Sequence, residues 1–152
     1  MCTKKVDNKN REEHGMHFAL ETDYAVRMIA VLADNHGENG CMGAAALGEA
    51  ACIPKPTALK VLRTLKDKGL IHSTIGVNGG YRLAREPKEI TLADVIEAME
   101  GKIEISRCLS DCYECSRTGK NHGSCKFHCA FESINEKFLT ELEGITFEGK
   151  NL

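Results

Sequence analysis

Five of the eight cysteines lie close together, between residues 108 and 129. Their spacing is Cys108-x3-Cys112-x2-Cys115-x9-Cys125-x3-Cys129. Thiolates are soft ligands that favour zinc, Cu(I) and iron–sulfur centres, so this segment predicts a metal or cluster site. Structural zinc is an open alternative, because the last four of these cysteines have nearly the spacing of a zinc knuckle. Reversible oxidation of metal-free thiols is a third.

The remaining cysteines, Cys2, Cys41 and Cys52, are isolated in the sequence. We interpret them as a tail residue and small buried hydrophobic residues, not as ligands. The sequence contains no nucleophile–base constellation and no phosphate-binding loop, so an enzyme is not expected.

Length and composition indicate the domain organisation of the chain and the cellular compartment that its cysteines occupy. The 152 residues suffice for one domain with appendages, and they contain no signal peptide and no membrane-length apolar run. A cytoplasmic protein without membrane attachment is therefore expected. Thiols stay reduced there, which favours metal or redox chemistry over structural disulfides.

Charge is distributed unevenly along a chain whose net charge is only −2. Residues 54–88 carry eight basic side chains against two acidic ones, whereas residues 91–148 carry eleven acidic against six basic. This contrast favours a nucleic-acid surface on one part of the chain. The alternative is a solvated charged surface.

The basic region coincides with a helix-turn-helix pattern. A first helix is expected from Thr22, as N-cap, to about residue 34. A short alanine-rich helix at 44–51, a break at Cys52-Ile53-Pro54 and a helix at 54–68 follow. Two helices joined by a tight turn, the second with exposed basic residues, are typical of DNA-binding proteins.

A β-hairpin is expected directly after these helices. Residues 70–74 and 81–83 predict two strands, and the glycine-rich stretch 76–80 between them predicts a tight tip. A hairpin in this position is a wing, whose tip approaches the DNA backbone.

Two further helices complete the chain. Thr91 and Asp94 form a capping box at the start of a helix that ends near Glu100. Apolar residues from Phe127 to Leu142 recur at helical spacing and predict a long amphipathic helix. We expect this helix to pair with a second copy of the chain, since helix-turn-helix proteins usually read two half-sites as dimers; packing on its own domain is the alternative.

The expected fold is therefore mostly α with a small β-hairpin wing. Residues 1–15 form a disordered tail, and residues 16–104 form a winged helix-turn-helix DNA-binding domain. Residues 105–128 form a cysteine-rich cluster-binding loop, and residues 129–152 form the dimerisation helix and C-terminal tail.

Four motifs in order resemble the Rrf2 family of bacterial winged-helix transcription regulators. They are DYAVR at 23–27, LKDKGLI at 65–71, GGYRLA at 79–84 and ITLADVI at 90–96. The resemblance extends from about Phe18 to Phe147 and implies a DNA-binding homodimer.

The resemblance also implies ligands for a 2Fe–2S or 4Fe–4S cluster. Three loop cysteines bind the cluster in this family, and the matching positions are Cys108, then Cys112 or Cys115, and Cys125. The fourth ligand is a histidine three residues after the last cysteine in one branch, matched by His128. In another branch it is a first-helix aspartate from the other subunit, matched by Asp23.

The sequence departs from the family pattern at several positions. Cys129 is additional, the gap before Cys125 is longer, and an arginine common near the wing tip is Ile75 here. An acidic residue that separates classes of DNA site in the family is Leu59. The operator preference of relatives is therefore not carried over.

The leading hypothesis is a homodimeric repressor that binds double-stranded operator DNA and senses iron, redox state or nitric oxide. Zinc or bare thiols could replace the cluster in a redox or cysteine-metabolism sensor, and a redox or metal carrier that does not bind DNA is the remaining alternative. Expected major-groove contacts are Pro56, Thr57 and Lys60; expected phosphate or minor-groove contacts are Lys55, Arg63, Asn78 and Arg82.

Overall fold

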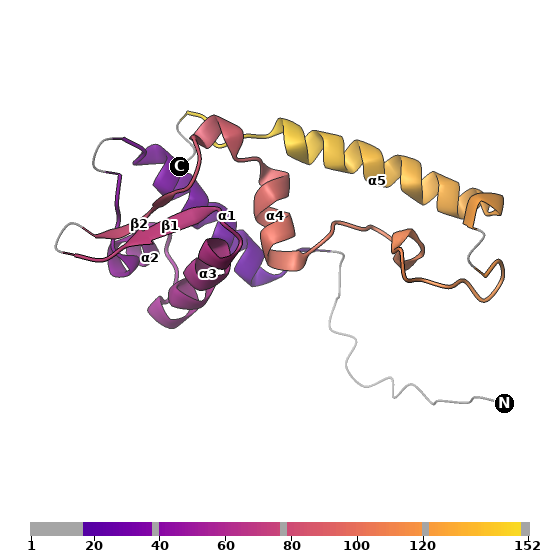
Figure 1. The fold of residues 1–152 in the computed structure, drawn as a ribbon, viewed down its shortest axis with the longest axis horizontal. Coiled ribbons are helices and arrows are strands. Elements are labelled where there is room, and N and C mark those ends of the chain that lie inside the picture. Colours follow the sequence, from indigo (N-terminus) through magenta and orange to yellow (C-terminus); the bar gives the residue numbers. More distant parts are fainter. Residues whose placement is uncertain (1–16, 38–39, 77–78, 120–121, 150–152) are drawn as a thin grey trace.

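The computed structural model describes residues 17–37, 40–76, 79–119 and 122–149. The expected tail at 1–15, Cys2 and the wing-tip residue Asn78 lie outside the described residues. Helices and a hairpin cluster at one end of an elongated molecule, and the helix α5 (Lys126–Gly144) extends away from them (Figure 1).

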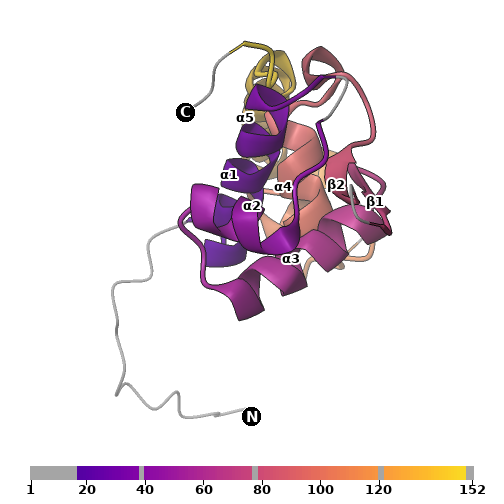
Figure 2. The same ribbon diagram turned by 90° about the vertical axis from the view of Figure 1, so that its left-hand side faces the viewer.

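Three helices build the core of the helix-turn-helix unit. They are α1 (Leu20–Asp34), α2 (Ala44–Ala50) and α3 (Lys55–Asp67), and they pack against one another. Their apolar stripes meet in one cluster, where Met28, Leu47 and Leu62 are fully buried. Figure 2 shows α3 crossing beside the hairpin. The expected helices are all present; the ends of α2 and α3 lie within one residue of those predicted, whereas α1 begins three residues earlier.

The hairpin is formed by β1 (Ile71–Thr74) and β2 (Gly80–Leu83), which pair antiparallel from Ile71–Leu83 to Thr74–Gly80. On its outer edge the backbone of Met42 exchanges two hydrogen bonds with Tyr81, at 2.9 and 2.8 Å. A Cβ atom on Gly80 would lie 2.6 Å from the Met42 carbonyl oxygen, so only glycine permits this close approach.

The expected N-cap of α1 is wrong. The helix starts at Leu20 with Ala19 as its N-cap residue, and the buried Thr22 lies inside it. A distant side chain satisfies this helix end instead: Glu100 Oε1 accepts hydrogen bonds from the Ala19 N–H at 2.7 Å and the Thr22 hydroxyl at 2.5 Å. A carboxylate at a helix N-terminus also interacts favourably with the helix dipole.

The linker helix α4 (Leu92–Glu100) follows the short 3₁₀ turn η1 (Pro87–Glu89). Its expected capping box is present, because the Thr91 hydroxyl accepts from Asp94 N–H at 3.1 Å and the Asp94 carboxylate accepts from Thr91 N–H at 2.9 Å. Gly101, with φ of 87°, ends the helix and begins the path to the cysteines.

The C-terminal part of α5 docks on its own chain. Leu142 is buried in a second, small apolar cluster with Ala93, Ile96 and Ile103, and Phe138 packs against it. Asn135 adds two hydrogen bonds to the linker backbone: its Oδ1 accepts from Ile105 N–H at 3.0 Å, and its Nδ2 donates to Ile103 O at 3.1 Å. Packing on its own domain is thus observed for this half of the helix.

After α5 the chain returns to the winged domain. Leu92 N–H donates to Ile145 O at 2.8 Å, and Thr91 pairs with Thr146 in an isolated β-bridge. The Phe147 side chain is buried in the main core, and its N–H lies within hydrogen-bonding distance of the Pro87 and Ile90 carbonyls, at 3.2 and 3.3 Å. Residues expected to form a tail therefore hold α5 to the domain. None of the described helices has the length and apolar character needed to cross a membrane.

Candidate nucleic-acid interface and cysteine segment

The helix α3 has one buried and one exposed face. Ala58, Val61 and Leu65 are fully buried in the core, whereas Lys60 and Arg63 are exposed on the other side. The other expected contact residues at its start are also accessible: Lys55 and Pro56 are exposed, and Thr57 is half-buried. The sequence pattern therefore placed the basic side chains of this helix correctly on its solvent face.

The turn before α3 holds an unexpected cysteine. Cys52 was expected to be a small buried residue, but it is exposed and its φ is 56°, in the left-handed region. Its N–H donates to Glu49 O at 3.0 Å. The geometry that the helix-turn-helix requires at this position directs its side chain to solvent, so the expectation of burial is wrong. Cys41 is half-buried.

The hairpin contributes one described candidate contact to the same end of the molecule. Arg82 lies exposed on β2, next to the buried Leu83. Ile75, just before the tip, is fully exposed. An apolar side chain that no part of its own domain covers is compatible with a surface that another molecule approaches.

Lys60 has a partner that the sequence did not indicate. Its ammonium lies 2.9 Å from Glu21 Oε1, in the first turn of α1. The hydrogen bond from Lys60, with the positive charge of its ammonium, lowers the pKa of the Glu21 carboxyl below its usual value. The two residues are far apart in the sequence, and only the packing of α1 on α3 brings them together.

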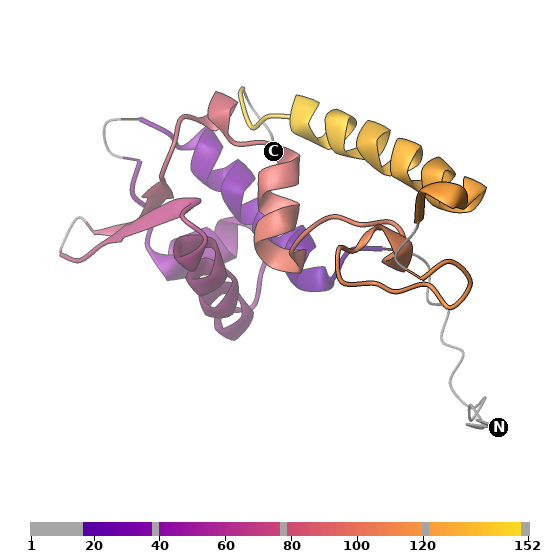
Figure 3. The same ribbon diagram turned by 45° about the vertical axis from the view of Figure 1, so that its right-hand side comes forward.

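The cysteine segment (residues 106–125) runs from the end of α4 to the start of α5. It lies under the N-terminal end of α5, at the opposite end of the molecule from α3 and the hairpin (Figures 1 and 3). Its described residues, 106–119 and 122–125, contain two 3₁₀ turns, η2 (Arg107–Leu109) and η3 (His122–Ser124), and otherwise have the loop character expected. All its cysteines are free thiols, and so is Cys129.

Serine hydroxyls accompany two of these thiols. The Cys108 Sγ lies 3.2 Å from the Ser106 hydroxyl, and the Cys112 Sγ lies 3.3 Å from the Ser110 hydroxyl. Cys112 is exposed, whereas Cys108 is half-buried. Hydrogen bonds to sulfur stabilise a ligating thiolate, so these pairs suit a metal-binding role.

Cys115 lies in a tight turn. It exchanges backbone hydrogen bonds with Gly119, at 3.0 and 2.7 Å, and Gly119 has a φ of 59°. The backbone N–H of Arg117 lowers the pKa of the Cys115 thiol, and the side chain and backbone of Thr118 act in the same direction. A thiol that faces backbone donors is the better prepared of the two candidates for the middle ligand.

The other predicted ligands lie at helix starts. Cys125 is the N-cap residue of α5, where the helix dipole favours negative charge, and His128 lies half-buried in the first turn. Cys129 Sγ donates to Gly123 O at 3.8 Å. Asp23 pairs with Arg27 on the same helix, at 2.6 Å.

Within residues 17–37, 40–76, 79–119 and 122–149, no three His, Cys, Asp or Glu side chains converge closely enough to hold a metal ion. The donor chemistry nevertheless fits a soft metal or an iron–sulfur centre, since four free thiols share one segment of about twenty residues. Metal sites of this kind often form only as the metal binds, because the free energy of metal binding offsets the entropic cost of ordering the ligands.

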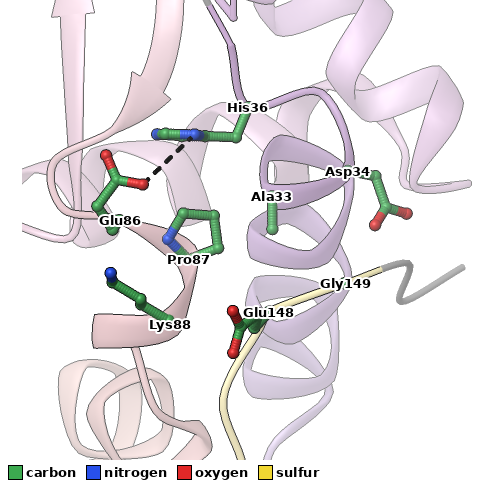
Figure 4. Close-up of a pocket in the computed structure, with 8 residues that line it drawn as sticks. All are labelled: Ala33, Asp34, His36, Glu86, Pro87, Lys88, Glu148 and Gly149. Atoms are coloured by element: carbon green, nitrogen blue, oxygen red, sulfur yellow. Dashed lines mark ion pairs between the residues drawn. The ribbon is translucent and has the colours of Figure 1, made fainter.

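A shallow cavity of about 400 Å³ lies elsewhere, between the end of α1, η1 and the C-terminal segment. Figure 4 shows His36 facing Glu86, with His36 Nδ1 and Glu86 Oε2 4.0 Å apart, and Glu148 on the opposite wall. None of the residues predicted to bind DNA or metal lines it. This cavity therefore adds no residue to the predicted DNA-binding or metal sites.

Comparison with known proteins places the whole arrangement in a family. Residues 19–149 match the Rrf2 family, which is described as iron-dependent transcriptional regulators. A putative HTH-type transcriptional regulator of Aquifex aeolicus is 29% identical over 133 residues, covering 88% of this chain and 90% of the relative.

Two solved structures share the fold. The IscR structure of T. potens superposes with a TM-score of 0.65 at 25% identity, covering 88% of this chain and 84% of that one. CymR of B. subtilis, described as the global cysteine regulator, superposes with a TM-score of 0.68 at 22% identity, covering 88% and 95%. These matches confirm the predicted winged-helix fold, and the family, the Aquifex aeolicus relative and CymR are described as regulators rather than enzymes. The chain belongs to the Rrf2 family of transcriptional regulators.

Proposed function

We propose that this Rrf2-family regulator represses transcription as a homodimer on double-stranded operator DNA, and that an iron–sulfur cluster in the cysteine segment controls its binding. One observation carries the proposal: a solvent-facing basic helix beside a hairpin is joined, through α4, to a segment with four free thiols. The family description as iron-dependent regulators supports the same reading.

The DNA-binding part of the proposal rests on α3. Pro56, Thr57 and Lys60 would enter the major groove, while Lys55 and Arg63 would contact phosphates. Arg82, with Asn78 at the tip, would contact the backbone or minor groove from the hairpin. The described members of this set are exposed, apart from the half-buried Thr57, and such contacts require accessible side chains.

The dimer part rests on the N-terminal half of α5. Phe127, Phe131 and Ile134 are 61%, 40% and 54% exposed, although large apolar side chains at this spacing normally face a partner. A second copy of α5 would cover them and would place two copies of α3 for two half-sites. Replacing Ile134 by glutamate should give a monomer in light scattering, whereas Ser133→Glu, which adds the same charge beside it, should leave the dimer intact.

The sensory part rests on the thiols. Cys108, Cys115 and Cys125 would bind the cluster, with Cys112 as the alternative middle ligand and His128 or the other subunit's Asp23 as the fourth. A bound cluster would supply reversible redox chemistry and sensitivity to iron supply or nitric oxide. The cysteine segment joins α4 to α5, so closing it around ligands would act on the elements that hold the two DNA-binding domains.

The cluster is tested by purifying the protein without oxygen and measuring iron, sulfide, zinc and visible absorbance. Cys108→Ala and Cys125→Ala should each abolish the absorbance, and Cys52→Ala, which removes an exposed thiol outside the segment, should not. Retained absorbance in either of the first two variants would refute the assignment. A content of one zinc ion per chain without sulfide would instead identify the site as structural zinc.

DNA binding is tested by selecting duplexes from a random pool and measuring their affinity at several salt concentrations. Lys60→Ala should weaken binding to the selected duplex, and Lys137→Ala, an exposed lysine on α5, should not. Equal affinity for all duplexes would favour a redox or metal carrier over a regulator of specific sites.

A second function is supported by the separation of the thiols in the structure. The cysteine segment could sense oxidants or sulfur compounds through its thiols without metal, as the description of CymR as a cysteine regulator suggests for a protein of the same fold. Protein without iron, whose DNA affinity changes on treatment with a disulfide and recovers with a thiol, would establish this function in place of the cluster.

A further inference from the structure

We propose that Glu21 competes with DNA for the ammonium group of Lys60 and thereby limits the affinity of α3 for any polyanion. This inference rests on the proposed binding of DNA by α3. In the free protein Glu21 Oε1 accepts the hydrogen bond from Lys60 Nζ at 2.9 Å. Binding to DNA must open this ion pair, so that the ammonium group turns to DNA and the carboxylate turns to solvent.

The position of Lys60 makes it the group that this competition affects. The side chain is 71% exposed, in the middle of the solvent face of α3, with Thr57 and Arg63 one turn away on either side. Glu21 reaches the lysine from a different helix, so the pair is not an i,i+4 contact that merely stabilises α3. Its carboxylate takes one of the three N–H donors of the ammonium and places a negative charge 2.9 Å from Nζ, so an approaching phosphate or base acceptor meets both a competitor and a repulsive charge.

The first turn of α1 is fixed, which holds Glu21 in place. Glu100 Oε1 accepts hydrogen bonds from the Ala19 N–H and the Thr22 hydroxyl on both sides of Glu21. Thr22 is only 2% exposed, so this attachment is shielded from solvent on one side of the turn. A carboxylate on an anchored turn loses little freedom when it pairs, and therefore competes better than one on a mobile segment.

The competition has a measurable electrostatic consequence. An exposed ion pair of this type is worth little, so its removal should raise DNA affinity by about two- to five-fold. Salt screens the exposed Lys60–Glu21 pair, so the pair costs the wild type most affinity at low salt. The plot of log affinity against log salt should therefore be steeper for Glu21→Gln than for the wild type.

The test is a double-mutant cycle on the full-length protein, with fluorescence anisotropy of a selected duplex as the readout. Glu21→Gln should raise the affinity in the wild-type background and leave it unchanged in the Lys60→Met background. Glu97→Gln, an exposed α4 residue with the same change of charge, is the matched control and should have no effect. An equal gain in both backgrounds would mean simple repulsion of DNA by Glu21 and would overturn the proposal.

The remaining outcomes are also decisive. Unchanged or weaker binding by Glu21→Gln would show that the carboxylate does not compete, or that it holds Lys60 ready for DNA, and either result overturns the proposal. If no duplex is bound specifically, the proposed function fails, but elution from immobilised heparin still tests the competition. Glu21→Gln should then elute at higher salt than the wild type only when Lys60 is present; elution at the same salt would overturn it.

Discussion

Asn135 should be the most informative single residue for the attachment of α5. Its carboxamide makes two hydrogen bonds to the linker, accepting from Ile105 N–H at 3.0 Å and donating to Ile103 O at 3.1 Å. Each such bond contributes about 1 kcal/mol, so Asn135→Ala should lower the free energy of unfolding by about 2 kcal/mol. Asn135→Asp keeps the acceptor but sets a carboxylate against the Ile103 carbonyl, so it should be at least as destabilising near neutral pH.

Urea unfolding followed by circular dichroism measures this loss. With a slope of about 2 kcal/mol per molar urea, the midpoint should fall by about 1 M. Amide hydrogen exchange should show at the same time that Ile105 N–H loses protection. Ser133→Ala, an exposed change on the same helix, should shift neither quantity. An unchanged midpoint and unchanged protection of Ile105 in Asn135→Ala would refute the role given to these bonds.

Three further predictions concern the second core, the hairpin and the cysteines. Leu142→Ala should lower the free energy of unfolding by about 2–3 kcal/mol in urea titrations, because it removes the central side chain of a small cluster; a loss under about 0.5 kcal/mol would contradict this packing. Gly80→Ala should destabilise the protein by about 1–3 kcal/mol, since the new Cβ meets the Met42 carbonyl, and a thermal midpoint equal to that of the wild type would exclude the clash. The backbone N–H of Arg117 lowers the pKa of the Cys115 thiol and so favours the thiolate. In metal-free protein, alkylation of Cys115 by iodoacetamide, measured by mass spectrometry, should therefore begin at lower pH than alkylation of free cysteine. Identical pH profiles for Cys115 and free cysteine would disprove the lowered pKa.

Local signals predicted much of the fold. The capping box of Thr91 and Asp94 is formed within one turn of helix, and the sequence alone located it. Gly69, with a φ of 75°, follows the end of α3, in a left-handed conformation that a residue without a Cβ atom adopts readily. The helical spacing of the apolar residues similarly placed Lys60 and Arg63 on the exposed face of α3.

Contacts between distant residues could not be predicted in this way. Thr22 has a side chain typical of an N-cap residue, but its hydroxyl donates a hydrogen bond to Glu100. This hydrogen bond forms only because α4 packs against α1. Phe147 was assigned to a tail, because nothing in its neighbourhood shows that it would enter the core. Glu21 and Lys60 are likewise joined only by tertiary packing.

The candidate cluster site was predicted in composition but not in geometry. The spacing predicted a soft-metal site, the family resemblance pointed to Cys108 and Cys125 within it, and the structure adds that Cys115 is in a turn with backbone donors facing its thiol. A sequence pattern does not show which thiols converge, because sites of this kind often take their geometry only when a metal binds.

The one-sided attachment of α5 makes it a lever arm. Its 19 residues span about 28 Å, and its contacts with the winged domain, through Asn135 and Leu142, begin at its midpoint and continue in the segment after Gly144. Lys126, nine residues before Asn135, lies about 14 Å from this pivot, so a tilt of about 10° moves the N-terminal end by about 2.4 Å. DNA half-sites are separated by one helical turn of about 34 Å, so in the proposed dimer a change confined to the cysteine segment would shift each copy by less than a tenth of that spacing.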